Sequence, residues 1–132
     1  MRKIMIHHFL GESICTTMDD VQKTLEQSID GVNEFLIAQK HDLYPYLTVL
    51  VNGIYANVTF VPSEESAGLQ AVSDDTETDL EPDGISVFYT NTPSEETEVY
   101  NDYVIPKNLA VQIVKEFAET GTMPNCTEWD EL

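Results

Sequence analysis

Residues 46–61 read YLTVLVNGIYANVTFV, two apolar-rich segments on either side of Asn52-Gly53. Asn-Gly is the preferred central pair of a type I′ turn, the tight connection of a β-hairpin. A turn at this position pairs Val51 with Ile54 and sets the register of both strands. One face of the hairpin is then entirely apolar, so we expect it to lie in the core. This face carries Leu47, Val49, Val51, Ile54, Ala56 and Val58.

The opposite face of the same hairpin is amphipathic. In the predicted register it carries the pairs Leu50 with Tyr55, Thr48 with Asn57, and Tyr46 with Thr59. Aromatic side chains interleaved with polar ones fit either a solvent-facing surface or a contact surface for a partner. The sequence of the hairpin leaves both interpretations open.

The segments on either side of the hairpin predict two main helices and further strands. One helix is expected over 18–39, capped by Thr17, although Gly31 is able to divide it. The second is expected to open at Pro106 and to end at Gly121, with Pro124 preventing its continuation. Strands are expected at residues 3–9, 68–72, 85–90, 99–104 and 125–129. We therefore predict a single α+β domain over residues 1–132, a mostly antiparallel sheet with two main helices.

Composition narrows the class of partner. The chain has 132 residues with 24 acidic and 6 basic side chains, a formal net charge of −18. Such a chain repels phosphate, which argues against direct binding to nucleic acid or to an anionic membrane surface. The apolar start of the chain is interrupted by His7 and His8 and is too short for a signal-peptide core. We expect a cytoplasmic protein, with Cys15 and Cys126 as free thiols.

The acidic residues concentrate in the middle of the chain, where no Lys or Arg occurs between Lys40 and Lys107. Because no cation offsets this charge locally, we expect a basic partner to dock there through charged hydrogen bonds. The alternative is a solvated loop that keeps the protein soluble, and the docking surface is then the hairpin face with Tyr46 and Tyr55. The acidic candidates are Glu64, Glu65, Asp74, Asp75, Glu77, Asp79, Glu81 and Asp83.

No arrangement of residues predicts catalysis. The run from Asp79 to Gly84 has the appearance of a calcium loop, but the twelfth position is Thr90 instead of the Glu that closes such a site. The sequence has no phosphate-binding glycine loop, no C-x-x-C pair and no serine elbow. We expect no catalytic residue, no metal and no cofactor, and we predict that the chain is not an enzyme.

The C-terminal quarter resembles a known family. The residues are Ile105-Pro106, the following helix with Phe117, and the segment TGTMPNCTEW at 120–129. They are similar to the ending of immunity protein family one, small cytoplasmic proteins of bacterial polymorphic toxin systems. Thr127 departs from the pattern, which often has an aliphatic residue there. The resemblance implies that the motif residues are determinants of the fold: Pro106, Phe117, Gly121, Pro124 and Trp129.

The resemblance implies binding instead of catalysis. Members of the family are encoded beside a toxin and neutralise it in a tight complex, and the toxins are often nucleic-acid deaminases. The charge is consistent with this function, since a toxin acting on nucleic acid needs a basic groove that an acidic protein complements. Two alternative functions remain: an acidic adaptor or structural module for a basic protein, and a small carboxylate-based enzyme. A neighbouring toxin gene would distinguish the first function from these two.

Overall fold

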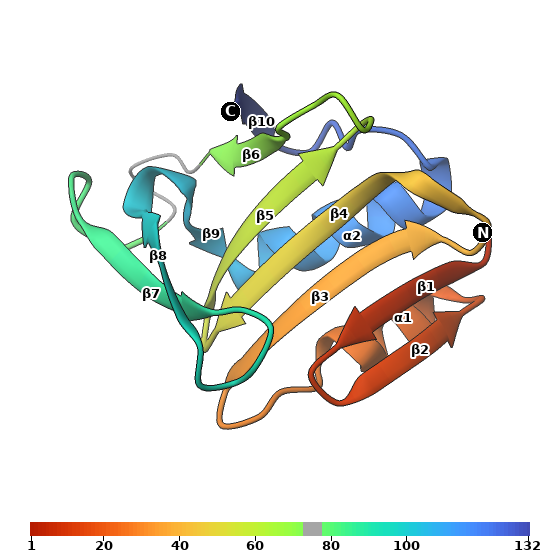
Figure 1. The fold of residues 1–132 in the computed structure, drawn as a ribbon, viewed down its shortest axis with the longest axis horizontal. Helices are drawn as coiled ribbons and strands as arrows, with labels where there is room; N and C mark the ends of the chain where they lie inside the picture. Colours follow the sequence, from red (N-terminus) through yellow and green to blue (C-terminus); the bar gives the residue numbers. More distant parts are fainter. Residues whose placement is uncertain (73–77) are drawn as a thin grey trace.

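Figure 1 shows the computed structural model, which describes residues 1–72 and 78–132. In this part of the chain, eight strands form one antiparallel sheet with the order β10-β6-β5-β4-β3-β1-β2, and β9 pairs with the start of β5. The strands are β1 Ile4–His8, β2 Gly11–Cys15, β3 Val32–Gln39, β4 Asp42–Asn52, β5 Tyr55–Val61, β6 Leu69–Val72, β9 Ile105–Pro106 and β10 Glu128–Glu131.

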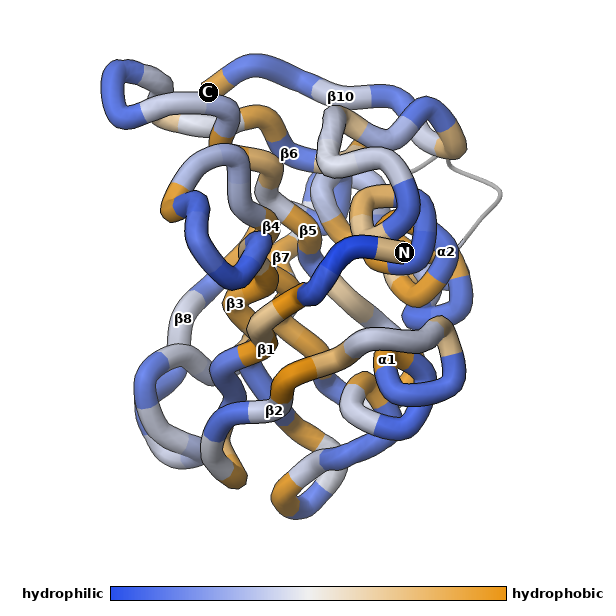
Figure 2. The backbone as a smooth tube through the Cα atoms, turned by 90° about the vertical axis from the view of Figure 1, so that its right-hand side faces the viewer, coloured by the Kyte–Doolittle hydropathy of each residue, from blue (hydrophilic) through white to orange (hydrophobic). Residues whose placement is uncertain are grey.

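The sheet lies between two unlike layers. Helices α1 (Met18–Leu25) and α2 (Lys107–Thr120) cover one face. A two-stranded sheet made of β7 (Ile85–Tyr89) and β8 (Glu96–Tyr100) lies against the other face, where β7 contacts β3 and β4. Figure 2 shows this order, with the helices on the right, the sheet in the middle and β8 on the left. The α+β prediction is confirmed. No helix in residues 1–72 and 78–132 is long and apolar enough to cross a membrane.

The core fills the space between the sheet and the two helices. Strand residues alternate between this face and the other, so every second side chain of β3, β4 and β5 is buried here. Phe60 of β5 and Phe117 of α2 meet edge to face, with their ring centroids 6.2 Å apart. Each fully buried apolar side chain stabilises the fold by roughly 1.5–3 kcal/mol. The core includes Ile4, Ile6, Phe35, Ile37, Leu47, Val49, Val58, Ile105, Ile113 and Phe117.

The hairpin at 46–61 forms with the predicted faces but in a different register. Asn52 pairs with Tyr55, so the two central residues of the turn are Gly53 and Ile54. Only Gly53 has a positive φ, +62°, so the type I′ prediction is wrong, since that turn needs two such residues. The shift places Phe60 opposite Leu47 and extends the pairing to the end of the apolar run. Because the shift is two residues, each strand residue keeps its face, and only Ile54 leaves the core.

The prediction of one helix over 18–39 is correct for residues 18–25 and wrong beyond them. Helix α1 ends at Leu25, and the same apolar stretch continues as strand β3 in the middle of the sheet. The chain reverses at Asp30 and Gly31, which have φ angles of +52° and +83°. A central strand is apolar on both faces, and such a pattern also contains residues at helical spacing. Strand β2 was also not predicted from the sequence.

The start of α1 and the end of α2 follow the capping rules. Thr17 accepts a hydrogen bond from the Asp20 N–H, and the Asp20 carboxylate accepts one in return from the Thr17 N–H, which completes a capping box. Pro106 immediately precedes the first residue of α2, and Gly121 ends that helix in the left-handed conformation, with φ +70°. The last strand begins at Glu128, three residues later than predicted.

Candidate partner-binding surface

The β7–β8 hairpin is fixed to the sheet through its inner face. Phe88 is fully buried between the hairpin and the sheet. The Asn52 side-chain amide donates to the Val87 carbonyl at 3.0 Å. At the far end, the Glu34 carboxylate accepts from the Thr90 hydroxyl at 2.6 Å and from the Asn91 N–H at 3.0 Å. These contacts hold the hairpin in one position, so its outer face is presented rigidly.

The outer face carries large apolar side chains that nothing in the described part of the chain covers. Cross-strand pairs join Ile85 with Tyr100, Val87 with Glu98, and Tyr89 with Glu96. Ile85 is 52 % exposed and Tyr100 is 67 % exposed. An aromatic and aliphatic centre with charged neighbours has the composition of a protein–protein interface. We call these six residues the β7–β8 outer face.

The turn between β4 and β5 extends this surface. An open hollow separates β7 from residues 52–55 of the turn, and Leu80 lines its wall. Ile54 is 71 % exposed at the tip of the turn. The Tyr55 hydroxyl donates a hydrogen bond to the Asp79 carboxylate, and this bond raises the pKa of the Tyr55 phenol. The bond also fixes Asp79 beside the hollow.

The charge around the outer face is strongly negative. Residues 41–106 contain thirteen acidic residues and no Lys or Arg. Lys107 lies beside the β4–β5 turn, where its N–H donates to the Ile54 carbonyl at 2.8 Å. The other cations of α1 and α2 lie across the sheet, and Arg2, Lys3 and Lys40 lie where β1 begins and β3 ends (Figure 1). A charge distribution of this kind steers a basic partner toward the acidic side of the molecule. The exposed acids near the outer face are Asp79, Glu81, Asp83, Glu95, Glu96, Glu98 and Asp102.

The residues proposed from the sequence for partner binding do not form one cluster. Glu64 and Glu65 are exposed just beyond the end of β5, whereas Tyr55 and Asp79 lie at its start, about 20 Å away for seven residues of strand. Tyr46 shares the sheet face of Tyr55 but lies opposite Val61 at the far end of β5, and its ring is 5.5 Å from that of Tyr44. Asp74, Asp75 and Glu77 lie outside the described residues.

The residues that carry the family resemblance lie in or beside the core. Phe117 is fully buried, and Gly121 and Pro124 are buried where the chain leaves α2. Trp129 is half-buried; its indole N–H donates to the Pro124 carbonyl at 2.9 Å, and its ring is 6.0 Å from that of Phe60. These contacts connect the C-terminal strand to the end of α2.

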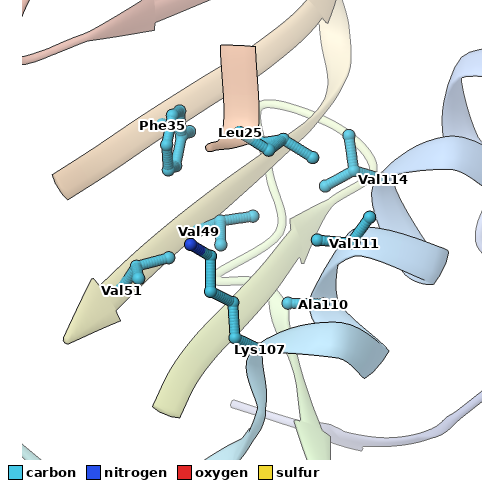
Figure 3. Close-up of a pocket in the computed structure, with 8 residues that line it drawn as sticks. All are labelled: Leu25, Phe35, Val49, Val51, Lys107, Ala110, Val111 and Val114. Carbon is cyan, nitrogen blue, oxygen red and sulfur yellow. The ribbon is translucent and has the colours of Figure 1, made fainter. Parts of the chain in front are cut away.

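A small hollow between α1 and α2 is the other notable feature (Figure 3). Its wall is apolar, from Leu25 of α1 and Val111 of α2 to Val49 and Val51 of the sheet. Lys107 is the one charged residue that lines it, and its side chain extends toward Val49 and Val51 in the view of Figure 3. No three His, Cys, Asp or Glu side chains in residues 1–72 and 78–132 are grouped as metal ligands.

No protein-family model and no curated protein matches this chain.

The exposure of the apolar residues on this surface was not predicted from the sequence. Ile85, Val87 and Tyr100 were assigned only to strands, and Ile54 was assigned to the core. The stretch ISVFY at 85–89 indicates such a surface, because it has apolar residues at both odd and even positions and therefore on both faces of the strand. A strand of this kind in a two-stranded sheet buries one face and leaves the other for solvent or for a partner.

Proposed function

We propose that this protein is an immunity protein, which binds and neutralises a cognate toxin in the cytoplasm of the bacterium that produces it. The observation that carries the proposal is the β7–β8 outer face, an exposed apolar strip between acidic residues on a hairpin fixed to the sheet. The C-terminal resemblance to immunity protein family one supports the toxin as the partner.

The surface has the parts that a tight complex requires. Tyr100 and Ile85 are positioned to act as anchors, since aromatic and aliphatic side chains near the centre of an interface supply most of its binding energy. Glu96 and Glu98 flank these anchors on the same face. Charged residues at the rim raise the rate of association more than the final affinity.

The charge indicates the chemistry of the toxin. A toxin that acts on nucleic acid holds the phosphate backbone in a groove of Arg and Lys side chains. A strongly acidic surface occupies the same groove by imitating the phosphate charge. The proposed partner is therefore a basic, nucleic-acid-acting toxin domain of the deaminase type, whose active-site region the protein occludes.

Growth of a bacterial host tests the function directly. The product of the gene adjacent to this one is expressed alone and together with the protein. We expect growth arrest in the first case and normal growth in the second. An adjacent product that binds the protein but is harmless alone would refute immunity and favour an acidic adaptor instead.

A charge-neutralising pair of variants tests the surface. Glu96→Gln with Glu98→Gln should slow association with the toxin severalfold at low salt and weaken its salt dependence. The matched control is Glu119→Gln with Glu128→Gln, which removes two exposed charges from the end of α2 and from the start of β10. Equal effects of the two double variants would mean that only net charge matters.

A further inference from the structure

Strand β8 has an unpaired outer edge. The Asn101 N–H donates to the Gly84 carbonyl and the Thr90 N–H to the Glu95 carbonyl. In an antiparallel ladder, hydrogen-bonded pairs of residues alternate with non-hydrogen-bonded pairs. The two bonds above make Gly84–Asn101 and Thr90–Glu95 hydrogen-bonded pairs. The pairs that Glu96, Glu98 and Tyr100 form with β7 are therefore non-hydrogen-bonded. The backbone N–H and C=O groups of Glu96, Glu98 and Tyr100 therefore point away from β7.

The opposite edge of the hairpin supports this assignment. Val87, which pairs with Glu98, directs its carbonyl away from β8 and accepts from the Asn52 side chain at 3.0 Å. On β8, no described residue outside the hairpin makes a hydrogen bond to the corresponding backbone groups. Figure 2 shows β8 on the side of the hairpin that faces away from the sheet, so the edge is open to a partner.

The side chains along this edge determine what can pair with it. Glu96, Glu98 and Tyr100 alternate on the outer face, with Ile85 beside Tyr100. Acidic residues on an edge strand normally prevent pairing with a second copy of the same chain, because like charges meet. The same residues favour a strand that brings Lys or Arg to the opposite positions.

Two other strands of the main sheet also have an outer edge, but their surroundings differ. Strand β2 carries a single acid, Glu12, whose carboxylate already lies 3.1 Å from the His7 ring. Strand β10 carries exposed acids, but its one apolar side chain, Trp129, is half-buried beside Phe60. Only at β8 does the free edge adjoin exposed Ile85 and Tyr100.

We propose that the partner adds an extended, basic segment as a third strand to the outer edge of β8. This proposal rests on the proposed function, because it describes how the toxin is held. The main-chain hydrogen bonds supply affinity, and Lys or Arg at alternate positions supply selectivity through Glu96 and Glu98. The segment continues the β7–β8 sheet and places its apolar side chains against Tyr100.

Proline at position 98 tests the proposal. Glu98→Pro removes the outward N–H but leaves the pairs of Thr97 and Val99 with β7, since proline is tolerated where the N–H faces solvent. Glu98→Ala is the matched control, because it removes the same side chain and keeps the N–H. We expect Glu98→Pro to bind the toxin about tenfold more weakly than Glu98→Ala. Equal affinities would refute strand addition.

Amide exchange in the wild-type complex gives a readout that does not depend on folding of the variant. The amides of Glu96, Glu98 and Tyr100 should become protected when the adjacent-gene product binds. If that product binds and these amides exchange as before, strand addition is wrong, whereas the proposed function stands.

A synthetic peptide tests strand addition to β8 independently of the toxin. An eight-residue peptide of alternating Lys and Thr should protect the same amides, and a peptide of alternating Glu and Thr should not. If the Lys peptide protects these amides but co-expression of the protein leaves the adjacent-gene product toxic, strand addition is supported and immunity is refuted. Failure of both the Lys peptide and the toxin to protect the amides would refute strand addition.

Discussion

Replacement of Trp129 by Ala should destabilise the protein without removing a partner contact. The change deletes the hydrogen bond to the Pro124 carbonyl, about 1 kcal/mol, and the ring contact with Phe60, about 0.5–1.5 kcal/mol. A fully buried aromatic costs about 3–5 kcal/mol on replacement by Ala, and Trp129 is only half-buried. We therefore expect a loss of about 2–3 kcal/mol in the free energy of unfolding.

Urea unfolding followed by far-ultraviolet circular dichroism measures this loss, since the variant lacks the only tryptophan. With a slope of about 2 kcal/mol per molar urea, the midpoint should fall by roughly 1–1.5 M. Trp129→Phe keeps the ring beside Phe60 and loses the hydrogen bond, so it should cost about 1 kcal/mol. A Trp129→Ala variant of wild-type stability that no longer binds the toxin would show that Trp129 is a contact residue and refute the reasoning.

Three further changes test particular contacts. The pKa of Asp20 is lowered chiefly by the hydrogen bond from the Thr16 N–H. Its contribution to stability is therefore complete above the unfolded pKa of about 3.9 and is lost as the pH falls through the lower folded value. The stability difference between wild type and Asp20→Ala should shrink between urea melts at pH 7 and pH 3, and a constant difference would contradict this. Glu34→Ala removes both bonds to the turn after β7, so the Asn91 amide should exchange faster, at a cost of about 1–3 kcal/mol; unchanged exchange would refute that anchor. Tyr55→Phe should remove one late step from an alkaline titration of phenol absorbance, since Asp79 raises the pKa of Tyr55, and a titration that loses an earlier step would argue against the bond.

The hairpin at 46–61 shows how much of the fold the sequence contains. Alternation of apolar and polar residues predicted which face of each strand is buried, and a two-residue error in register left that prediction intact because the period of a strand is two. The turn itself depended on how far the apolar run extends beyond Val58. Pairing of Phe60 and Val61 outweighed the preference of Asn-Gly for a type I′ turn.

The helix error and the missed surface have a different cause. Val32, Phe35 and Leu36 fit a helical stripe as well as a buried strand, and only their place between β1 and β4 decides between the two. The exposure of Ile85 and Tyr100 likewise depends on tertiary packing, since it follows from which face of the β7–β8 hairpin meets the sheet. Local sequence contains neither fact.

The affinity of the toxin for two matched variants tests the central claim most directly. Ile85 and Ile14 are equally exposed, at 52 %, but Ile85 lies on the β7–β8 outer face and Ile14 lies on β2, an edge strand of the main sheet. Ile85→Ser should weaken binding about tenfold or more, as expected for an apolar anchor at an interface, and Ile14→Ser should leave the dissociation constant unchanged. Unchanged binding by Ile85→Ser, with or without a loss in Ile14→Ser, would contradict the assignment of the β7–β8 outer face as the toxin-binding surface.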